Sequence, residues 1–411
     1  MERHVLQRQI EAVQQAEYRK AQLEPPVVPR LAYSRMLLGG AIESFRSETN
    51  LREALLGCAF LLRFLGVYVA RPPISAHEIP QHYTVLMNHV LRLHQTVTEN
   101  FTAISTFFAA HDMRVRPFDL DDICLATVPA ASPNAYVTRL SPSDKILVLF
   151  NMSIIPMICG VSRLAAESAD IGDLGALLSV EYNRDKTLEK VLELEPAFYP
   201  LLKAIRGIIY GDVSLLLDIA GRPPPPANRV FRILCDAMAA YVVAHEFGHV
   251  MLGHPLGESQ SGGQDALLVA RQELEADGFA FLMNIFGQKQ AAISGGLAEV
   301  PELFKSCALS AFGAQDLLLR TYWMVEGICH NYCGVQTKKS RMVRHPPYSD
   351  RLDLLKRTAI DVVPDLASNI ERICGGHQDL VQIAGDAFLV YAEQEGFGKD
   401  VAPYLRAALG L

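Results

Sequence analysis

Hydrophobic residues recur every three or four positions along most of the chain, which is the spacing of amphipathic helices. A polar helix is predicted for residues 1–20, and more apolar helices are predicted for residues 34–69 and 81–111, with proline pairs between them. Helical spacing returns over residues 160–220 and again after residue 300. The pattern therefore predicts a chain that consists mostly of helices.

The pattern changes between residues 113 and 155, where short apolar runs are separated by Pro, Ser, Asn and Asp. These runs cover residues 123–128, 135–140 and 145–150, and their length and composition are typical of β-strands. Together with the helices they predict an α+β fold that is mostly α-helical and contains one small β-sheet.

Two further helices are predicted on either side of a loop rich in Ser and Gly at residues 257–263. The first runs from about residue 228 to 253 and is followed by Pro255, which is a signal for the end of a helix. The second begins at Asp265, whose side chain suits an N-cap, and ends by Gly287. The predicted sheet therefore precedes this pair of helices along the chain.

Breaks in the pattern divide the chain into three parts. Residues 1–112 form an N-terminal helical region, residues 113–360 form a core with the sheet and the helix pair, and residues 361–411 form C-terminal helices. The helices at about 160–222 end at a proline-rich break and form an insertion within the core. A chain of this length is long enough for one large or two ordinary domains.

The composition of the chain indicates which classes of partner the protein can bind. Half of the 411 residues are hydrophobic, 20% are charged and the net charge is -7, whereas nucleic acid binding needs clustered Lys and Arg. The chain lacks the roughly 20 consecutive apolar residues of a membrane span, and its polar start lacks the apolar segment of a signal peptide. Its eight cysteines lie mostly in apolar stretches, as in a reducing compartment. We therefore expect a soluble cytoplasmic protein without a nucleic-acid partner.

The helix predicted for residues 228–253 contains the sequence His245-Glu246-Phe247-Gly248-His249. Residues four apart lie on one face of a helix, so both imidazoles can bind one ion, and neutral imidazole is a common zinc ligand. Glu246 can reach a water on that ion as a general base without binding the metal itself. The segment predicts a zinc site with His245 and His249 as ligands and Glu246 as the catalytic base.

The next predicted helix supplies a third ligand in the sequence Glu-Leu-Glu-Ala-Asp at residues 273–277. Glu273 and Asp277 are four residues apart and share one face of the helix. Glu273 can therefore bind the metal, while Asp277 accepts a hydrogen bond from a ligand histidine, as zinc histidines normally require.

The same helical geometry argues against two nearby side chains as metal ligands. In a regular helix His254 lies about 140° around the axis from His249, and Glu275 lies about 200° around the axis from Glu273. We therefore expect His254 to be a histidine at the helix C-terminus and Glu275 to be a surface charge.

These motifs resemble those of the HtpX and CAAX-prenyl-protease family of gluzincin endopeptidases, which includes the mitochondrial Oma-type proteases. Two further segments are similar to that family: His345 followed by two prolines and, six residues on, Arg351, and the sequence Asn134-Ala135-Tyr136 before a second strand. The resemblance implies a zincin-like core with His345 and Arg351 near the metal, stabilising the oxyanion. It also implies that a peptide substrate adds as a strand beside residues 134–136.

The sequence thus predicts a soluble zinc metalloendopeptidase with one zinc ion per chain and a protein or peptide as substrate. The membrane helices typical of the HtpX and prenyl-protease relatives are absent from the pattern, which argues against prenylated substrates. Two alternatives remain: a regulatory protease dedicated to one partner protein, and a non-catalytic binding or scaffold protein that contains zinc. The sequence does not predict the oligomeric state.

Overall fold

The computed structural model describes residues 3–20, 80–110, 113–128, 135–151, 153–168, 199–210, 229–256, 266–298, 300–333 and 346–394. Its helices are α1 (Arg3–Lys20), α4 (Pro80–Ala109), α5 (Ile154–Ser168), α7 (Tyr199–Tyr210), α9 (Arg229–Met251), α10 (Ala266–Ser294), α11 (Pro301–Cys333), α13 (Tyr348–Val362) and α14 (Ala367–Gln394). Three strands and two short 3-10 turns, Leu120–Asp122 and Pro364–Leu366, complete the described elements. The prediction of a mostly helical α+β fold is confirmed.

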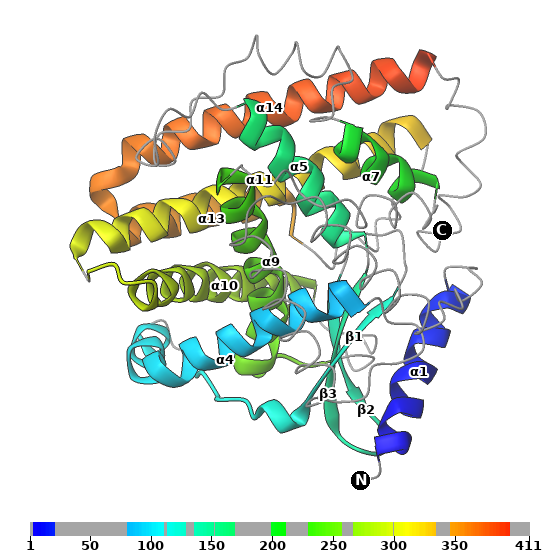
Figure 1. Ribbon diagram of the computed structural model, residues 1–411, viewed down its shortest axis with the longest axis vertical. Coiled ribbons are helices and arrows are strands. Elements are labelled where there is room, and N and C mark those ends of the chain that lie inside the picture. The colour runs from blue at the N-terminus through cyan, green and yellow to red at the C-terminus, as the bar shows by residue number, and fades with distance from the viewer. Residues whose placement is uncertain are drawn as a thin grey trace, which may run out of the picture.

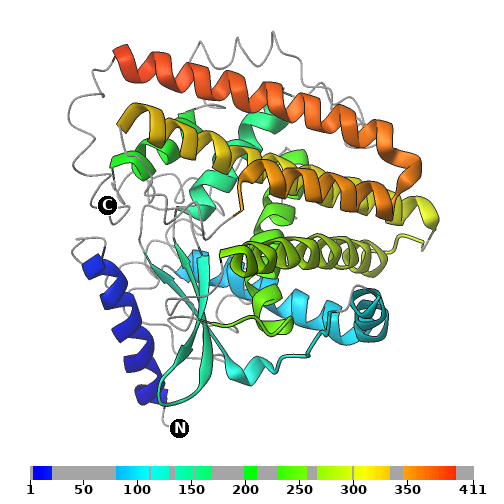
Figure 2. The same cartoon turned by 180° about the vertical axis from the view of Figure 1, so that it is seen from behind.

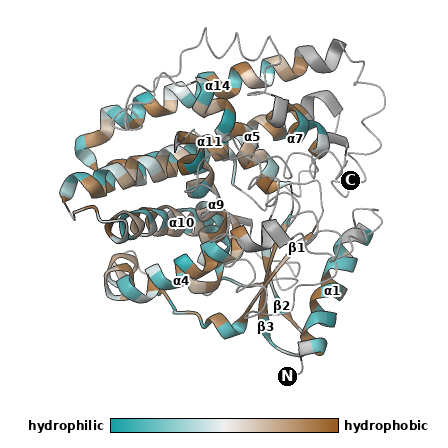
Figure 3. Cartoon of the chain, in the orientation of Figure 1, coloured by the Kyte–Doolittle hydropathy of each residue, from teal (hydrophilic) through white to brown (hydrophobic). Residues whose placement is uncertain are grey.

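The three strands form one mixed sheet in the order β1-β3-β2. Strand β3 (Lys145–Asn151) lies in the centre, parallel to β1 (Ile123–Val128) and antiparallel to β2 (Ala135–Leu140). All three coincide with the predicted apolar runs, β3 being one residue longer. Their hydrophobic colouring in Figure 3 reflects a sheet that is covered on both faces.

Alternate residues of β3 face two different layers. Leu147 and Leu149 pack on one face in a small core that includes Ile10 of α1, whereas Val148 and Phe150 face the main core of helices. This is the alternation expected of a strand buried on both sides. Figure 1 shows the sheet between α1 (blue) and the helices α4 and α9.

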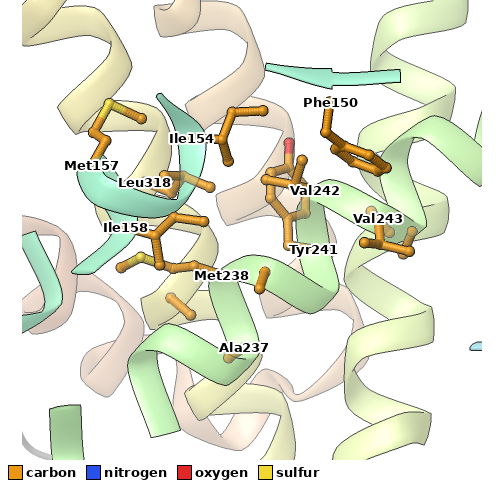
Figure 4. Close-up of a cluster of buried hydrophobic side chains, with 14 of the residues drawn as sticks. Phe150, Ile154, Met157, Ile158, Ala237, Met238, Tyr241, Val242, Val243 and Leu318 are labelled. Atoms are coloured by element: carbon orange, nitrogen blue, oxygen red, sulfur yellow. The ribbon is translucent and has the colours of Figure 1, made fainter. Parts of the chain in front are cut away.

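The main core gathers around the middle of α9. Figure 4 shows side chains from β3, α5, α9 and α11 meeting there, among them Phe150, Met157, Met238 and Leu318. These four side chains are at most 1% exposed, so α9 lies inside the molecule and its polar residues must find partners there.

Helix α9 crosses α10 at Gly248. A β-carbon at this position would lie only 3.2 Å from the Cα of Ala276 and 3.3 Å from a ring carbon of Phe279. The absence of a side chain on Gly248 therefore lets the two helix backbones approach closely. This crossing brings the polar residues of α9 and α10 together.

A second core lies between α10, α11, α13 and α14, where Phe281, Phe312 and Leu355 are buried. Helix α14 packs along α11, as Figure 2 shows from behind. A buried polar contact joins them: the Nδ1 atom of His377 in α14 lies 2.8 Å from Asp316 of α11, which also accepts a hydrogen bond from Arg320. This contact attaches α14, the last of the described helices, to α11.

Helix α4, which belongs to the predicted N-terminal region, packs against α9 and α10. Arg92 of α4 donates two hydrogen bonds to Asp236 of α9, at 2.8 and 2.6 Å, and a third to the Nδ1 atom of the buried His89 at 3.2 Å. Helix α4 therefore shares the main core with α9 and α10, whereas α1 packs in the small core on the other face of the sheet.

Some predictions concern residues outside the described part. The predicted helix at 34–69 lies wholly outside it, and the predicted insertion at 160–222 is described only at residues 160–168 and 199–210, both helical. Within the described residues, no helix combines the length and the apolar character needed to cross a membrane.

Candidate metal centre

Three polar side chains converge where α9 crosses α10. His245, His249 and Glu273 each offer one ligand atom, and these three atoms lie within 4.8 Å of one another. The Nε2 atom of His245 is 3.4 Å from one carboxylate oxygen of Glu273, and the Nε2 atom of His249 is 3.7 Å from the other. This group could hold a metal ion.

The spacing is that of a group that could surround one ion. The contacts of 3.4 and 3.7 Å run to different oxygens of Glu273, and one ligand atom from each residue lies within 4.8 Å of the other two. The donor chemistry fits as well, because two imidazole nitrogens and one carboxylate form a ligand set that leaves a fourth position open. The two histidines are one helical turn apart on α9, as their spacing predicted, and Glu273 comes from α10.

The Nδ1 atom of His245, on the side of the ring away from Glu273, meets Asp277. The distance from Nδ1 to the Oδ1 atom of Asp277 is 2.9 Å, and the same oxygen accepts a hydrogen bond of 2.5 Å from the hydroxyl of Tyr241. A carboxylate in this position fixes the orientation of the imidazole and leaves Nε2 directed at the ligand group. Asp277 therefore contacts His245 as expected, while the role of His245 as a metal ligand stays a prediction.

Arg351 of α13 lies behind Asp277. Its Nε and Nη2 atoms each donate a hydrogen bond of 2.7 Å to the two carboxylate oxygens, and Nη2 also reaches the Tyr241 hydroxyl at 3.2 Å. Its guanidinium carbon lies 5.6 Å from the ring centre of Tyr348, which stacks with Tyr322. The resemblance implied an Arg351 that stabilises the oxyanion, but the structure places its guanidinium on the carboxylate that holds His245.

His249 has a different partner on the Nδ1 side of its ring. This atom lies 2.9 Å from the Nδ1 atom of His254, whose own Nε2 atom lies 3.1 Å from Glu275. Glu275 also accepts a hydrogen bond of 2.7 Å from Arg271, an exposed residue one turn earlier on α10. The expectation that Glu275 is simply a surface charge is wrong, because its side chain is only 19% exposed and is bound on both sides.

The end of α9 explains how His254 turns back to His249. The helix stops at Met251, and the His254 N–H bonds to the carbonyl of His249 at 2.9 Å while the Gly253 N–H bonds to that of Val250 at 3.2 Å. Gly253 has a φ of +72°, and these features together form a Schellman C-cap. The angle of about 140° assumed that the helix continued to residue 254, so that geometry does not apply.

His245 and His249 differ in their affinity for protons. Burial disfavours the charged form of His245, but hydrogen bonds to Asp277 and Glu273 outweigh it and raise the pKa of His245 to about 10. Burial, followed by the neighbouring charge of His245, lowers the pKa of His249 to about 3. Despite its burial, Asp277 has a pKa held well below its ordinary value by Arg351 and His245. Asp277 therefore stays ionised, as a partner of a ligand histidine should.

The other residues predicted for the site are Glu246, His345 and the segment 134–136. Glu246 is on α9 beside His245 and is 7% exposed. Ala135 and Tyr136 begin β2, the edge strand, whereas Asn134 and His345 lie outside the described residues.

Sequence reasoning missed two contributors to the centre. Tyr241 precedes His245 by four residues, so helical spacing placed it on the same face, and this signal was available. His254 carried no such signal, because its position depends on the turn that ends α9.

Comparison with known proteins yields one match. Residues 222–360 match the family model described as Peptidase U49, and this segment contains α9, α10, α11 and most of α13. No curated protein and no solved structure matches the chain. The matched segment includes the three candidate ligands as well as Asp277 and Arg351. The match supports a peptidase with a protein substrate, while the resemblance to the HtpX-type family stays a prediction.

Proposed function

We propose that this chain is a zinc-dependent endopeptidase in which His245, His249 and Glu273 bind the metal. The observation that carries the proposal is the convergence of two Nε2 atoms on one carboxylate, with both Nδ1 atoms engaged on the opposite side. Three protein ligands leave a position open for catalysis, whereas structural zinc sites are usually closed by four. This ligand count favours an enzyme over the scaffold alternative.

The reaction assigned to this centre is the hydrolysis of a peptide bond. Bound zinc would act as a Lewis acid that makes water more acidic and polarises the carbonyl group. Glu246 accepts the proton of the attacking water and delivers it to the leaving amine, which is the usual division of labour for this motif. Its low exposure keeps the carboxylate in a site where electrostatic effects are strong.

The proposed substrate site runs along the outer edge of β2. This strand is at the edge of the sheet and contacts α9. An extended peptide that pairs with the backbone of Ala135 and Tyr136 would gain ladder hydrogen bonds close to the helix that carries Glu246. Tyr136 packs with the small core beneath α1, so the proposed recognition there uses its backbone.

The first test is the metal content of the purified protein. We expect about one zinc per chain in wild type, as for other three-ligand sites, and loss of zinc in His249→Ala and Glu273→Ala. Elemental analysis measures this directly, and the absence of zinc from carefully prepared wild type would overturn the proposal.

The second test separates catalysis from metal binding. Glu246→Gln should retain zinc but lose at least about a hundredfold in rate, because it removes the general base. Incubation of each protein with a cell extract, followed by labelling of new protein N-termini, detects cleavage without a known substrate. Many cleaved proteins would indicate a general endopeptidase and a single one a dedicated regulatory protease. Equal labelling by zinc-loaded wild type and Glu246→Gln would support the scaffold alternative.

A further inference from the structure

His254 is a buried histidine that is outside the ligand group but in contact with it. Its side chain is 5% exposed and lies between His249 and Glu275, at 2.9 Å from one and 3.1 Å from the other. A polar side chain buried this deeply needs both partners, because a buried ring nitrogen without a hydrogen bond destabilises the fold.

The carboxylate of Glu275 determines which ring nitrogens carry protons. An ionised carboxylate only accepts hydrogen bonds, so the Nε2 atom of His254 must be the protonated one. The Nδ1 atom of a neutral His254 is then an acceptor, and the Nδ1 atom of His249 must donate to it. This leaves the Nε2 atom of His249 without a proton, on the side that faces Glu273.

We infer that His254 is a positioning residue that holds His249 in the tautomer and ring orientation required of a metal ligand. The inference rests on the proposed zinc site and adds a residue that the ligand motif does not contain. Glu275 acts through His254, and the Schellman turn at Gly253 sets the distance between the two imidazoles.

The two ligand histidines are thus supported by unlike groups. His245 is held by a carboxylate that a buried arginine neutralises, whereas His249 is held by a neutral imidazole, and the carboxylate is one step further away. A carboxylate next to a ligand makes it more basic and tightens the metal. His254 instead fixes the direction of His249 without placing a negative charge beside it.

Three substitutions of His254 separate its two hydrogen bonds. His254→Asn retains an acceptor near the position of Nδ1, His254→Gln retains a donor toward Glu275, and His254→Phe keeps only the ring. Competition with a chelator measures zinc affinity without reference to activity. We expect the zinc affinity of the Phe and Gln variants to be about 10- to 100-fold lower than that of wild type. The Asn variant should retain most of the wild-type zinc affinity.

His377→Phe is a matched control. His377 is also buried and also bound to a carboxylate, Asp316, but it lies between α11 and α14. We expect this variant to lose thermal stability while its zinc affinity stays that of wild type. If His254→Phe binds zinc as tightly as wild type while His249→Ala does not bind, the inference about His254 is overturned and the proposed zinc site stands. If wild type itself does not bind zinc, the proposed function fails first.

Nitrogen NMR of the zinc-loaded protein gives an independent readout. With ¹⁵N-labelled histidine we expect a proton on Nδ1 of His249 and on Nε2 of His254. A proton on Nδ1 of His254 would contradict the inference, whereas a loss of stability alone would not change these signals.

Discussion

Asp277 is the residue on which most of the polar interactions around His245 depend. Its two carboxylate oxygens bind Tyr241 and His245 of α9 and Arg351 of α13. A carboxylate that is 2% exposed loses its hydration, and these partners replace it. The pKa of Asp277 therefore stays below its ordinary value, and the stability that it contributes is lost as the pH falls from the ordinary carboxyl pKa through that lowered pKa.

Replacement of Arg351 tests this arrangement. In Arg351→Met, Asp277 loses its bidentate cation, and we expect a loss of about 3 kcal/mol in the free energy of unfolding together with weaker zinc binding. Chemical denaturation and chelator competition measure the two effects. Arg357→Met on the same helix is the control, because Arg357 is exposed and should change neither quantity appreciably.

The same variant separates two roles for Arg351. A residue that supports His245 should lower zinc affinity when it is removed. A residue that only stabilises the oxyanion should leave zinc affinity unchanged and reduce the turnover rate of the zinc-loaded enzyme. Unchanged zinc affinity with lower turnover would support the oxyanion role that the family resemblance implied.

At the scale of the elements, the centre depends on how closely α9 approaches α10. Gly248 lies between the two ligand histidines, and Ala276 lies between Glu273 and Asp277. The helices therefore approach closely through a glycine and an alanine beside the three candidate ligands. A larger side chain at either position would separate the ligand atoms.

Substitution of Gly248 should therefore weaken the metal site from a distance. In Gly248→Val the added carbons meet the backbone of α10, and we expect at least about a tenfold loss of zinc affinity and about 1–3 kcal/mol of stability. Gly278→Ala on α10 is the matched control, since a β-carbon there has no neighbour within 4 Å. It should leave zinc binding unchanged and raise stability by up to about 1 kcal/mol, measured by the same two assays. An equal effect of both variants would contradict the importance of the crossing.

Much of this arrangement could be predicted because it depends on local periodicity. The three strands and the position of α9 follow from apolar spacing, and the pairs His245–His249 and Glu273–Asp277 follow from the helical turn. Helix α10 continues to Ser294 rather than ending by Gly287, because an isolated glycine does not end a helix whose neighbouring residues remain packed.

The parts that could not be predicted depend on contacts between distant segments or on the end of a helix. The partner of Arg351 is 74 residues away in the chain, so spacing alone does not show whether the guanidinium faces a substrate or a carboxylate. The position of His254 depends on Gly253 adopting a positive φ, which redirects the chain within one residue.

At the scale of the whole molecule, stability depends on how helix α4 is attached to α9. His89 is 4% exposed beside Arg92 and Asp236, and it accepts a hydrogen bond from the Arg92 guanidinium. Burial, which outweighs the effect of Asp236, lowers the pKa of His89 to about 4. The folded protein therefore keeps this histidine neutral at a pH where the unfolded chain binds a proton.

This difference gives a pH dependence with a definite sign. Below pH 6.5 the unfolded chain takes up a proton that folded His89 does not bind, so stability falls as the pH decreases from 6.5 to 4. A single group contributes a loss of up to about 3 kcal/mol over this range. In His89→Gln this contribution disappears, and urea denaturation at several pH values should show a shallower decline than in wild type. Parallel curves for the two proteins would show that His89 plays no part.

The distance between Asp277 and Arg351 along the chain also has a consequence during synthesis. A ribosome adds about 5–20 residues per second, so Arg351 is made about 4 to 15 seconds after Asp277. Helix α10 is completed at Ser294 within this interval, and until Arg351 is made the carboxylate beside His245 has no guanidinium to neutralise it. The nascent chain thus carries an unfinished centre until α13 has left the ribosome, which delays the proposed proteolytic activity until most of the protein has been translated.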